Sequence, residues 1–503
     1  MLIKFVVGIC ALMRAKGLVP ALSSQMLQRN VFVRASAKEL LVTGNTYYMR
    51  GELESARQRY EQCLTSDDDD HRTQLDCAVN LASVSLDLGD EEGAEKLYRK
   101  VLSQSMHIDA AHNLASLLQR RSGYNTTNRK SLLFEAAGLY RQVLRQDNER
   151  WDAWANLGSA ILHSEQADLD AARCLQRAIL LIEKSAQDNE QIRQATATAY
   201  FGLGSALIRF DQDEAQKAFD DEDFILLRFD NPQIAVLETA QNALRTAIAL
   251  CGNNNQVLKA KAEHALMIAT NSTTSSRASP LFVKALFDDF AQDFDDRLIG
   301  DLQYRVPQLI AQALMARRRK YCGFLDAGCG TGLAALELID RSILNKNATI
   351  IGVDLSDSMI AKAQVRGIYD ALLVGDLCDD SIYQRLVPEF ISNPLDLIVA
   401  ADVFCYLGDL EPLLSRFSQN LSIEGDLIFT VETLNSNNQN TEHWALGPSG
   451  RYAHSPKYIA NLATSLGLSC IELQSIVARL ENSKPVNSTL FLFQKKKNPQ
   501  RRE

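Results

Sequence analysis

The sequence predicts two kinds of structure in one chain: an all-α array of helical repeats, followed by an α/β domain built around a mostly parallel sheet. The first prediction rests on small and apolar residues that recur at helical spacing in units of about 34 residues. The second rests on apolar runs of strand length that alternate with helical segments after residue 280. The Ser/Thr-rich stretch from Asn271 to Pro280 lies between them and predicts a linker.

Length and composition agree with a soluble protein of two domains. A chain of 503 residues is too long for one hydrophobic core. With 46% hydrophobic and 23% charged residues, the chain is neither disordered nor fibrous in composition. Acidic residues outnumber basic ones, 62 to 53, and the short basic tail from Lys495 is too small to hold nucleic acid by counterion release. We therefore expect no nucleic-acid partner.

The N-terminus is typical of a targeting segment. The first 38 residues contain no acid and carry six basic residues, as organelle transit peptides do. We expect residues 1–36 to be removed, with the mitochondrion as the first choice of compartment and the cytoplasm as an alternative. The apolar run from Phe5 to Met13 also suits a secretory signal, although it is too short to span a bilayer. An untargeted N-terminus remains the third option.

The ten cysteines favour free thiols. They are scattered through predicted helices and strands, and no C-x-x-C pair or matching histidine spacing occurs among them. This pattern argues against a disulfide framework and against a zinc site, and it favours a reducing compartment. We expect no metal.

The helical part repeats a pattern of small and large residues. In the first unit Gly44 and Ala56 are small, and Tyr47 and Tyr60 are large. Corresponding residues follow in four further units, the last of which is interrupted by an acidic insertion near "DDEDF". The spacing resembles that of tetratricopeptide repeats, which implies a right-handed solenoid of about five helical hairpins and a capping helix from Val257 to Ala269.

Three asparagines stand at one position of this repeat, in the second, third and fourth units: Asn80, Asn113 and Asn156. The resemblance places that position on the concave side of the solenoid. Amides in register there would hydrogen-bond the backbone of an extended peptide. We therefore predict a protein partner in this groove, with a purely structural arm as the alternative.

The second part contains seven runs of strand length. An alternating order of strands and helices predicts a sheet with helices on both faces, and ligands bind such sheets at the carboxyl ends of the strands. The runs are "FLDAG", "TIIGVD", "ALLVGD", "LDLIVAAD", "GDLIFTVE", "SCIELQSIVARL" and "STLFLFQ".

A glycine turn follows the first of these strands. Gly328, Gly330 and Gly332 lie between the strand and the next helix, where missing side chains let a ligand approach the backbone. A dinucleotide site needs a further glycine where this chain has Leu333. Asp326 precedes the turn, where an anion would repel a pyrophosphate but suit a cationic ligand.

This order of motifs resembles the class I S-adenosylmethionine-dependent methyltransferases, and within them a group of predicted enzymes with N-terminal tetratricopeptide repeats. The resemblance implies a Rossmann-like domain of seven strands and S-adenosylmethionine as cofactor. It also implies roles for the strand ends: the glycine turn for the methionine part, Asp354 for the ribose and Asp376 for the adenine. The implied cofactor-binding residues are Asp326, Gly328, Gly330, Gly332, Asp354, Leu355, Met359, Asp376, Leu377, Ala401 and Asp402.

The acceptor of the methyl group is not indicated. The end of the fourth strand reads "AADVF" instead of the N/D-P-P-Y/F tetrapeptide of adenine and glutamine methyltransferases, and no catalytic base is evident. Four residues are candidates for the substrate pocket, namely Phe404, His443, Tyr452 and His454. We expect methyl transfer by in-line displacement to a small-molecule or protein acceptor. The alternative is a repeat scaffold whose methyltransferase-like domain binds cofactor without catalysis.

The expected organisation of the chain is a targeting segment at 1–36, helical repeats at 37–270, a linker at 271–280, a methyltransferase domain at 281–497 and a basic tail at 498–503.

Overall fold

The structure is a computed structural model of the chain. It describes residues 35–497 except 67–69, 124–127, 165–167, 186–188, 272–274, 292–293, 297, 299, 301, 387–392, 435–442 and 482–483. The expected targeting segment, apart from its last two residues, and the basic tail lie outside the described residues. The chain divides into two compact units between Ala110 and Ala111, and each is described by itself.

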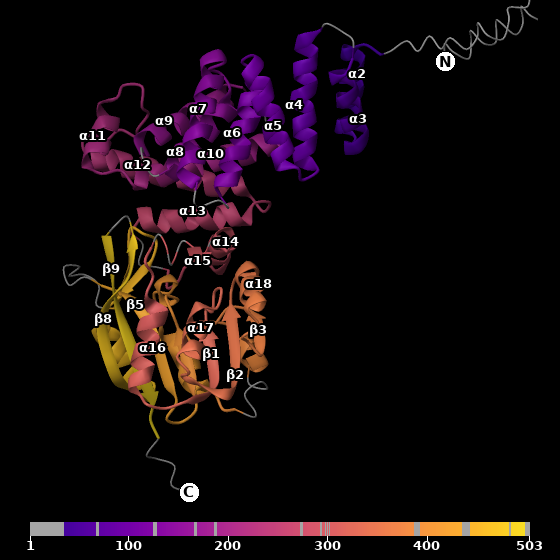
Figure 1. Cartoon of the computed structure of the whole chain (residues 1–503). Coiled ribbons are helices and arrows are strands. Elements are labelled where there is room, and N and C mark those ends of the chain that lie inside the picture. The colour runs from indigo at the N-terminus through magenta and orange to yellow at the C-terminus, as the bar shows by residue number, and fades with distance from the viewer. Residues whose placement is uncertain are drawn as a thin grey trace, which may run out of the picture. The chain divides into compact units, whose positions relative to one another are not determined.

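The first unit consists of helical hairpins (Figure 1). Gly44 allows the two helices of the first hairpin to approach closely, because a Cβ at this position would lie 2.5 Å from the Tyr60 ring. Tyr60 is fully buried at this contact and its hydroxyl donates to Asn45 Oδ1 (2.8 Å). The helices are α2 (Ala37–Met49), α3 (Leu53–Leu64), α4 (His71–Asp87) and α5 (Glu91–Gln104), and α6 (Ile108–Ser122) crosses the division.

Two cysteines of this unit form a disulfide bond. Cys63 at the end of α3 is joined to Cys77 in α4, and both are buried. The expectation of free thiols throughout is therefore wrong for this pair, because two positions 14 residues apart in sequence face each other across adjacent helices. The other cysteines that the structure describes carry free thiols.

Helical hairpins continue in the second unit. Glycines again mark their closest approaches: a Cβ at Gly158 would lie 2.7 Å from Leu175, and one at Gly204 would lie 2.6 Å from Leu244. No helix among the described residues is long and apolar enough to cross a bilayer. The helices are α7 (Arg129–Gln146), α8 (Trp151–Ser164), α9 (Asp168–Lys184), α10 (Glu190–Ile208), α11 (Gln212–Asp220), α12 (Pro232–Cys251) and α13 (Gln256–Ala269).

The α/β part begins with short helices and continues as one sheet with intervening helices. The strands are β1 (Tyr321–Ala327), β2 (Leu344–Asp354), β3 (Ala371–Val374), β4 (Leu397–Ala400), β5 (Asp426–Thr433), β6 (Trp444–Leu446), β7 (Tyr452–His454), β8 (Leu468–Glu481) and β9 (Lys484–Lys495). The helices are α14 (Pro280–Phe290), α15 (Phe294–Asp296), α16 (Val306–Ala316), α17 (Leu333–Asp340), α18 (Asp357–Arg366), α19 (Asp380–Leu386), α20 (Glu411–Asn420) and α21 (Pro456–Ser465), with a 3-10 turn, η3 (Phe404–Tyr406).

The sheet is mixed. Strands β3, β2, β1, β4 and β5 are parallel in that order, and β9 follows as an antiparallel neighbour of β5 with β8 at its other edge. All seven expected strands are present, but the described residues hold nine. The additional strands β6 and β7 form a small hairpin, and β7 pairs with the last two residues of β5, beyond its pairing with β4. Each is three residues long, too short to show an alternating pattern.

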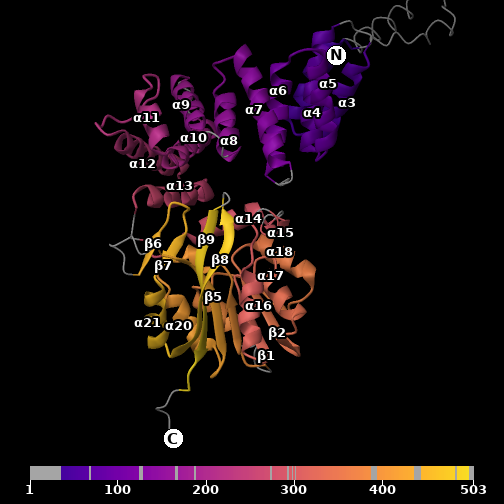
Figure 2. The ribbon, with the colours of Figure 1, turned by 60° about the vertical axis from the view of Figure 1, so that its left-hand side comes forward.

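Helices cover both faces of the sheet. On one face the buried side chains of α19, α20 and α21 pack with inward residues of the strands, and on the other face α16 and α17 do so. Figure 2 shows α20 and α21 on one side of the sheet strands and α16 on the other. The central strands are thus covered on both faces, which explains their continuous apolar runs.

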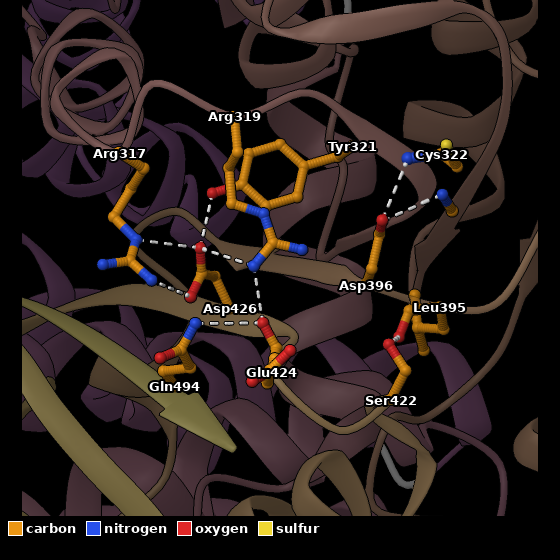
Figure 3. Close-up of polar contacts among 11 residues, drawn as sticks. Arg317, Arg319, Tyr321, Cys322, Leu395, Asp396, Ser422, Glu424, Asp426 and Gln494 are labelled. Atoms are coloured by element: carbon orange, nitrogen blue, oxygen red, sulfur yellow. Dashed lines mark hydrogen bonds and ion pairs between the residues drawn. The ribbon is translucent and has the colours of Figure 1, made fainter. Parts of the chain in front are cut away.

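A buried carboxylate holds the amino ends of the strands together (Figure 3). Asp426, the first residue of β5, is fully buried and accepts hydrogen bonds from Tyr321 Oη (2.6 Å) and Arg317 Nε (3.1 Å). Arg319 Nη1 lies 3.8 Å from the same carboxylate. The segment between α16 and β1 is thereby fixed to β5, at the end of the sheet opposite to the glycine turn.

Replacement of Asp426 by alanine should lower the free energy of unfolding by about 3 kcal/mol, because it leaves the Arg317 guanidinium and the Tyr321 hydroxyl without their buried partner. Urea denaturation of the full chain measures this. The matched control is Asp380→Ala, which removes an aspartate paired with Arg416 on the surface and should cost less than about 1 kcal/mol. Equal effects of the two substitutions would contradict this view of the network.

Candidate functional site

The candidate site lies at the carboxyl ends of the parallel strands. The chain leaves β1 toward β2 and β3 on one side and returns to β4 on the other, so the strand order reverses at β1. A crevice outside the strand ends is expected at such a reversal. The sequence places the glycine turn at this point.

The glycine turn has the backbone conformation that only glycine adopts readily. Gly328, Gly330 and Gly332 have φ of 73°, 54° and 96°. The amide of Gly328 donates to the carbonyl of Val353 in β2 (2.8 Å), and a Cβ on this glycine would overlap the Val403 side chain, which follows β4. The ends of three adjacent strands therefore pack directly on this turn.

Asp326 is a buried acid within β1. Its side chain accepts a hydrogen bond from Tyr369 Oη (2.7 Å), and only 1% of the residue is exposed. Burial raises the pKa of Asp326 to about 7, the Tyr369 hydrogen bond opposes this shift, and the nearby charge of Asp354 adds to it. The carboxyl group therefore stays protonated to a higher pH than an exposed aspartate does.

Asp354, the last residue of β2, binds the glycine turn. One carboxylate oxygen accepts from the amide of Gly330 (2.8 Å) and the other accepts from the amide of Ser356 (2.9 Å). Burial raises its pKa, while these amide hydrogen bonds act in the opposite direction. Leu355 follows directly, and Met359 is fully buried one turn into α18.

Asp376 follows β3 and carries a partner that the sequence did not indicate. Arg277 Nη2 lies 2.8 Å from Asp376 Oδ2, and the other carboxylate oxygen accepts from the amide of Cys378 (2.9 Å). Leu377 beside it is buried. The acid expected beside the adenine is therefore already part of an ion pair that is about one-third exposed.

The segment from Arg277 to Asp296 contacts each strand end of the site in turn. Besides the Arg277 pair, Asp288 of α14 accepts hydrogen bonds from the Ser356 hydroxyl and the Ser358 amide, and Asp295 of α15 accepts one from Thr331 in the glycine turn. Lys284 pairs with Asp357 at the start of α18, and this hydrogen bond raises the lysine pKa. Described residues of this segment are thus held by polar contacts to the ends of β1, β2 and β3.

The end of β4 is held in an unusual conformation. Asp402 has φ of 61°, in the left-handed region that non-glycine residues seldom adopt, and its amide donates to Thr430 Oγ1 of β5 (3.0 Å). Its carboxylate accepts from Arg479 Nη1 (2.6 Å). Ala401, just before it, is half-buried.

Arg479 is the centre of a buried ionic cluster. The residue is 1% exposed, and its guanidinium also donates to Glu432 of β5 (2.6 Å) and Glu481 of β8 (2.9 Å). Arg451 pairs with the same two glutamates. Three carboxylates and two guanidiniums thus meet beside the end of β4. A single arginine within the apolar run "SIVARLE" was the sequence signal for this cluster.

A cavity of about 600 Å³ adjoins this cluster. The end of β5, the β6–β7 hairpin and the start of β9 form its walls, and Glu432 and Arg451 line it together with Leu446, Pro448 and Val486. It is large enough for a small molecule or for one side chain of a protein.

The residues expected to form the substrate pocket lie around this region without lining that cavity. Phe404 is in the core, 4.5 Å from Phe429 between ring centroids. Tyr452 is buried and donates to the carbonyl of Ser275 (3.2 Å). His454 is buried against the carbonyl of Gly408 (3.0 Å), and burial lowers its pKa to about 4. His443 is exposed, with its ring 4.7 Å from that of Tyr458.

Two thiols lie near the site. Burial raises the pKa of Cys329 and of Cys405 well above the usual value, so neither is a thiolate nucleophile at neutral pH. In the part of the chain that the structure describes, no group of three or more His, Cys, Asp or Glu is arranged to hold a metal ion.

Residues 325–427 match a protein-family model described as "Methyltransferase domain". They run from β1 into β5, so they include the glycine turn and the ends of β2, β3 and β4. This chain contains a methyltransferase domain.

Curated relatives agree with this assignment. Malonyl-[acyl-carrier protein] O-methyltransferase of Bacillus cereus is 35% identical over 107 residues, which are 21% of this chain and 36% of that protein. Human methyltransferase-like protein 27 is 28% identical over 222 residues, which are 37% of this chain and 84% of that protein. The match to the bacterial relative therefore spans only about a third of its length.

Solved structures are similar to part of the chain. Magnesium protoporphyrin IX methyltransferase from Synechocystis PCC 6803, with bound SAH, shares 15% identity, and the similarity covers 43% of this chain and all of that one at a TM-score of 0.33. At this TM-score the likeness gives no information about the acceptor.

The affinity for S-adenosylmethionine should rise between pH 6 and pH 8. Because its pKa is raised in the folded protein, Asp326 contributes to the free energy of unfolding fully below pH about 4. This contribution is lost as the pH rises through about 7 and the buried group ionises. The ionised form attracts a cationic ligand, so protons and cofactor compete for it. Calorimetric titration at both pH values measures the change. The Asp326→Asn protein is the control, and a rise of the same size in that protein would show that another group is responsible.

Proposed function

We propose that this protein transfers the methyl group of S-adenosylmethionine to a small-molecule or protein acceptor by in-line displacement. The observation that carries the proposal is the set of strand ends around β1: a glycine turn, a buried acid before it, and a second acid that binds it from β2. The domain assignment alone does not give the activity of the whole chain or its acceptor, because the relatives match only parts of this chain.

The charges of the site suit the cofactor. Among the described residues, no lysine or arginine forms an ion pair with Asp326, which is almost completely buried, or with Asp354, which is half-buried. S-adenosylmethionine carries a sulfonium and an ammonium group, which would supply the missing positive charge. The amides of Gly330, Ser356 and Leu355 use part of the capacity of the Asp354 carboxylate, which has about four lone pairs, and the remainder can accept from a ribose hydroxyl.

Other residues of the proposed cofactor site surround these two acids. Gly328, Gly330 and Gly332 would lie against the methionine part, and Leu355 and Met359 would support the ribose side. Asp376 and Leu377 would contact the adenine, with Asp376 shared between the adenine amino group and Arg277. Ala401 and Asp402 would face the reacting methyl group.

The protein's main task in such a reaction is alignment. The bound cofactor supplies a methyl group that is already activated by its sulfonium. Positioning of an acceptor at near-attack distance is worth several kcal/mol, on the order of 7 to 11 in favourable cases. Asp402 is held by Thr430 and Arg479, so its carboxylate serves to fix the end of β4 rather than to act as a free base.

Replacement of Asp354 by alanine should weaken binding of S-adenosylhomocysteine by roughly 1.5 to 3 kcal/mol, the range for hydrogen bonds to a charged group. Calorimetric titration of the full chain measures this. The control is Asp370→Ala, which removes an acid that accepts from the amide of Ile350 (2.7 Å), four residues before Asp354 in β2. The site is misassigned if Asp370→Ala weakens binding as much as Asp354→Ala does.

We further propose that the helical hairpins form a tetratricopeptide solenoid that recruits a protein partner through Asn80, Asn113 and Asn156. The close contacts of Gly44, Gly158 and Gly204 with large residues of the paired helix support the repeat spacing. Asn80 Nδ2 donates to Asn45 (2.9 Å), and Asn156 Nδ2 lies 3.4 Å from His112 Nε2. These contacts of Asn80 and Asn156 use fewer than the two donors and two acceptor lone pairs that an amide side chain has.

The triple Asn80→Ala, Asn113→Ala, Asn156→Ala protein should lose the partners that wild type retains in a pull-down. Loss is expected because alanine cannot bond a peptide backbone. Circular dichroism checks that the helices remain, and Asn242→Ala, an exposed asparagine of α12, is the control. Recovery of the same partners in the same amounts by the triple variant would identify the hairpins as a structural arm.

A further inference from the structure

A cavity of about 510 Å³ lies among α7, α8 and α9 of the helical part, and its lining includes no residue of the proposed methyl-transfer site. The apolar part of its lining, called the floor below, includes Leu144, Trp154 and Leu157. The charged part of the lining consists of Arg141, Arg145, Arg173 and Asp170. Such a combination suits a ligand with one apolar group and one or more negative charges.

Two of these arginines have no counter-ion in the structure. Arg141 and Arg145 lie one turn apart on α7, both are exposed, and no described residue forms an ion pair or hydrogen bond with either side chain. The third, Arg173 on α9, is paired with Asp221 (2.7 Å) and with Asp170 (3.4 Å). Positive charge is thus available on the α7 side of the cavity, in a protein that is acidic overall.

The space among the next helices, α9, α10 and α12, is filled by an acidic segment of the chain itself. We call this space the filled gap, and its contacts indicate what a similar space can bind. Asp221 pairs with Arg173, and three residues later Phe224 is buried in one apolar cluster with residues of α9, α10 and α12. Gln176 holds the backbone of the next residue, Ile225, by two hydrogen bonds (2.8 and 2.9 Å). An acid, an aromatic ring and a backbone contact together dock this segment.

The two gaps correspond in the repeat. Leu175 of α9 aligns with Tyr140 of α7, so Gln176, which holds the segment's backbone, aligns with Arg141 in the lining of the cavity. Helices α7, α8 and α9 thus stand in the same repeat relation as α9, α10 and α12. The acidic insertion between α10 and α12 fills the space among α9, α10 and α12. The corresponding space among α7, α8 and α9 is the open cavity.

We propose that this cavity binds an acidic segment of a partner protein, with an aromatic side chain on the apolar floor and carboxylates at Arg141 and Arg145. The site differs from the asparagine groove. At 100° per residue, Trp154 and Asn156 of α8 point about 200° apart around the helix axis. The inference does not depend on the methyltransferase activity.

A labelled peptide with the chain's own docking sequence, DDEDFILL (residues 220–227), is the probe. Fluorescence anisotropy with the full-length protein should show saturable binding that weakens as salt is added. The double variant Arg141→Glu, Arg145→Glu should bind it about tenfold more weakly or worse, since it replaces attraction by repulsion. A peptide with alanine in place of phenylalanine should lose a similar factor.

The matched control is Arg177→Glu, an exposed arginine of α9 outside the cavity, which should bind the probe as wild type does. Circular dichroism and melting temperature confirm that each variant is folded. The proposal is overturned if wild type shows no saturable binding at about 1 mM peptide, or if the double variant binds as tightly as Arg177→Glu. It is also overturned if dodecanoate binds at the cavity and the peptide does not, since the occupant would then be a lipid carboxylate.

Discussion

The hydrogen bond from the amide of Gly330 to the carboxylate of Asp354 is the constraint on which the site depends (2.8 Å). It joins the turn after β1 to the end of β2. The other oxygen of the same carboxylate accepts from the amide of Ser356, the residue just before α18. A glycine is required because the turn has positive φ at three places. The half-buried aspartate both shapes the turn and presents acceptors to a ligand.

Charge is compensated differently on the two sides of the strand ends. Beside β4, Asp402 and Glu432 are neutralised by Arg479, which is itself completely buried. Beside β1 and β2, Asp326 and Asp354 lack a basic partner among the described residues, and burial raises the pKa of both. The first arrangement stabilises the fold, and the second leaves a place for a cation. This contrast separates the proposed cofactor region from the region where an acceptor would enter.

The sequence predicted most of the sheet and the positions of the strand-end acids, because glycine turns, apolar strands and acids at strand ends are local patterns. It did not predict contacts between segments far apart in the chain. Arg277 pairs with an acid 99 residues away, and Arg479 with one 77 residues away. The Cys63–Cys77 bond was missed for the same reason, since the helical register that brings the two together is a tertiary property. The three-residue strands β6 and β7 exist only through their pairing with β5.

A crystal structure of the full chain with S-adenosylhomocysteine tests the central claim most directly. The account predicts the ligand at the carboxyl ends of β1, β2 and β3, with its ribose hydroxyls on Asp354, its amino-acid part on the turn from Gly328 to Gly332, and its adenine beside Leu377. Ligand bound elsewhere in the chain, or a ribose that makes no contact with Asp354, would contradict it.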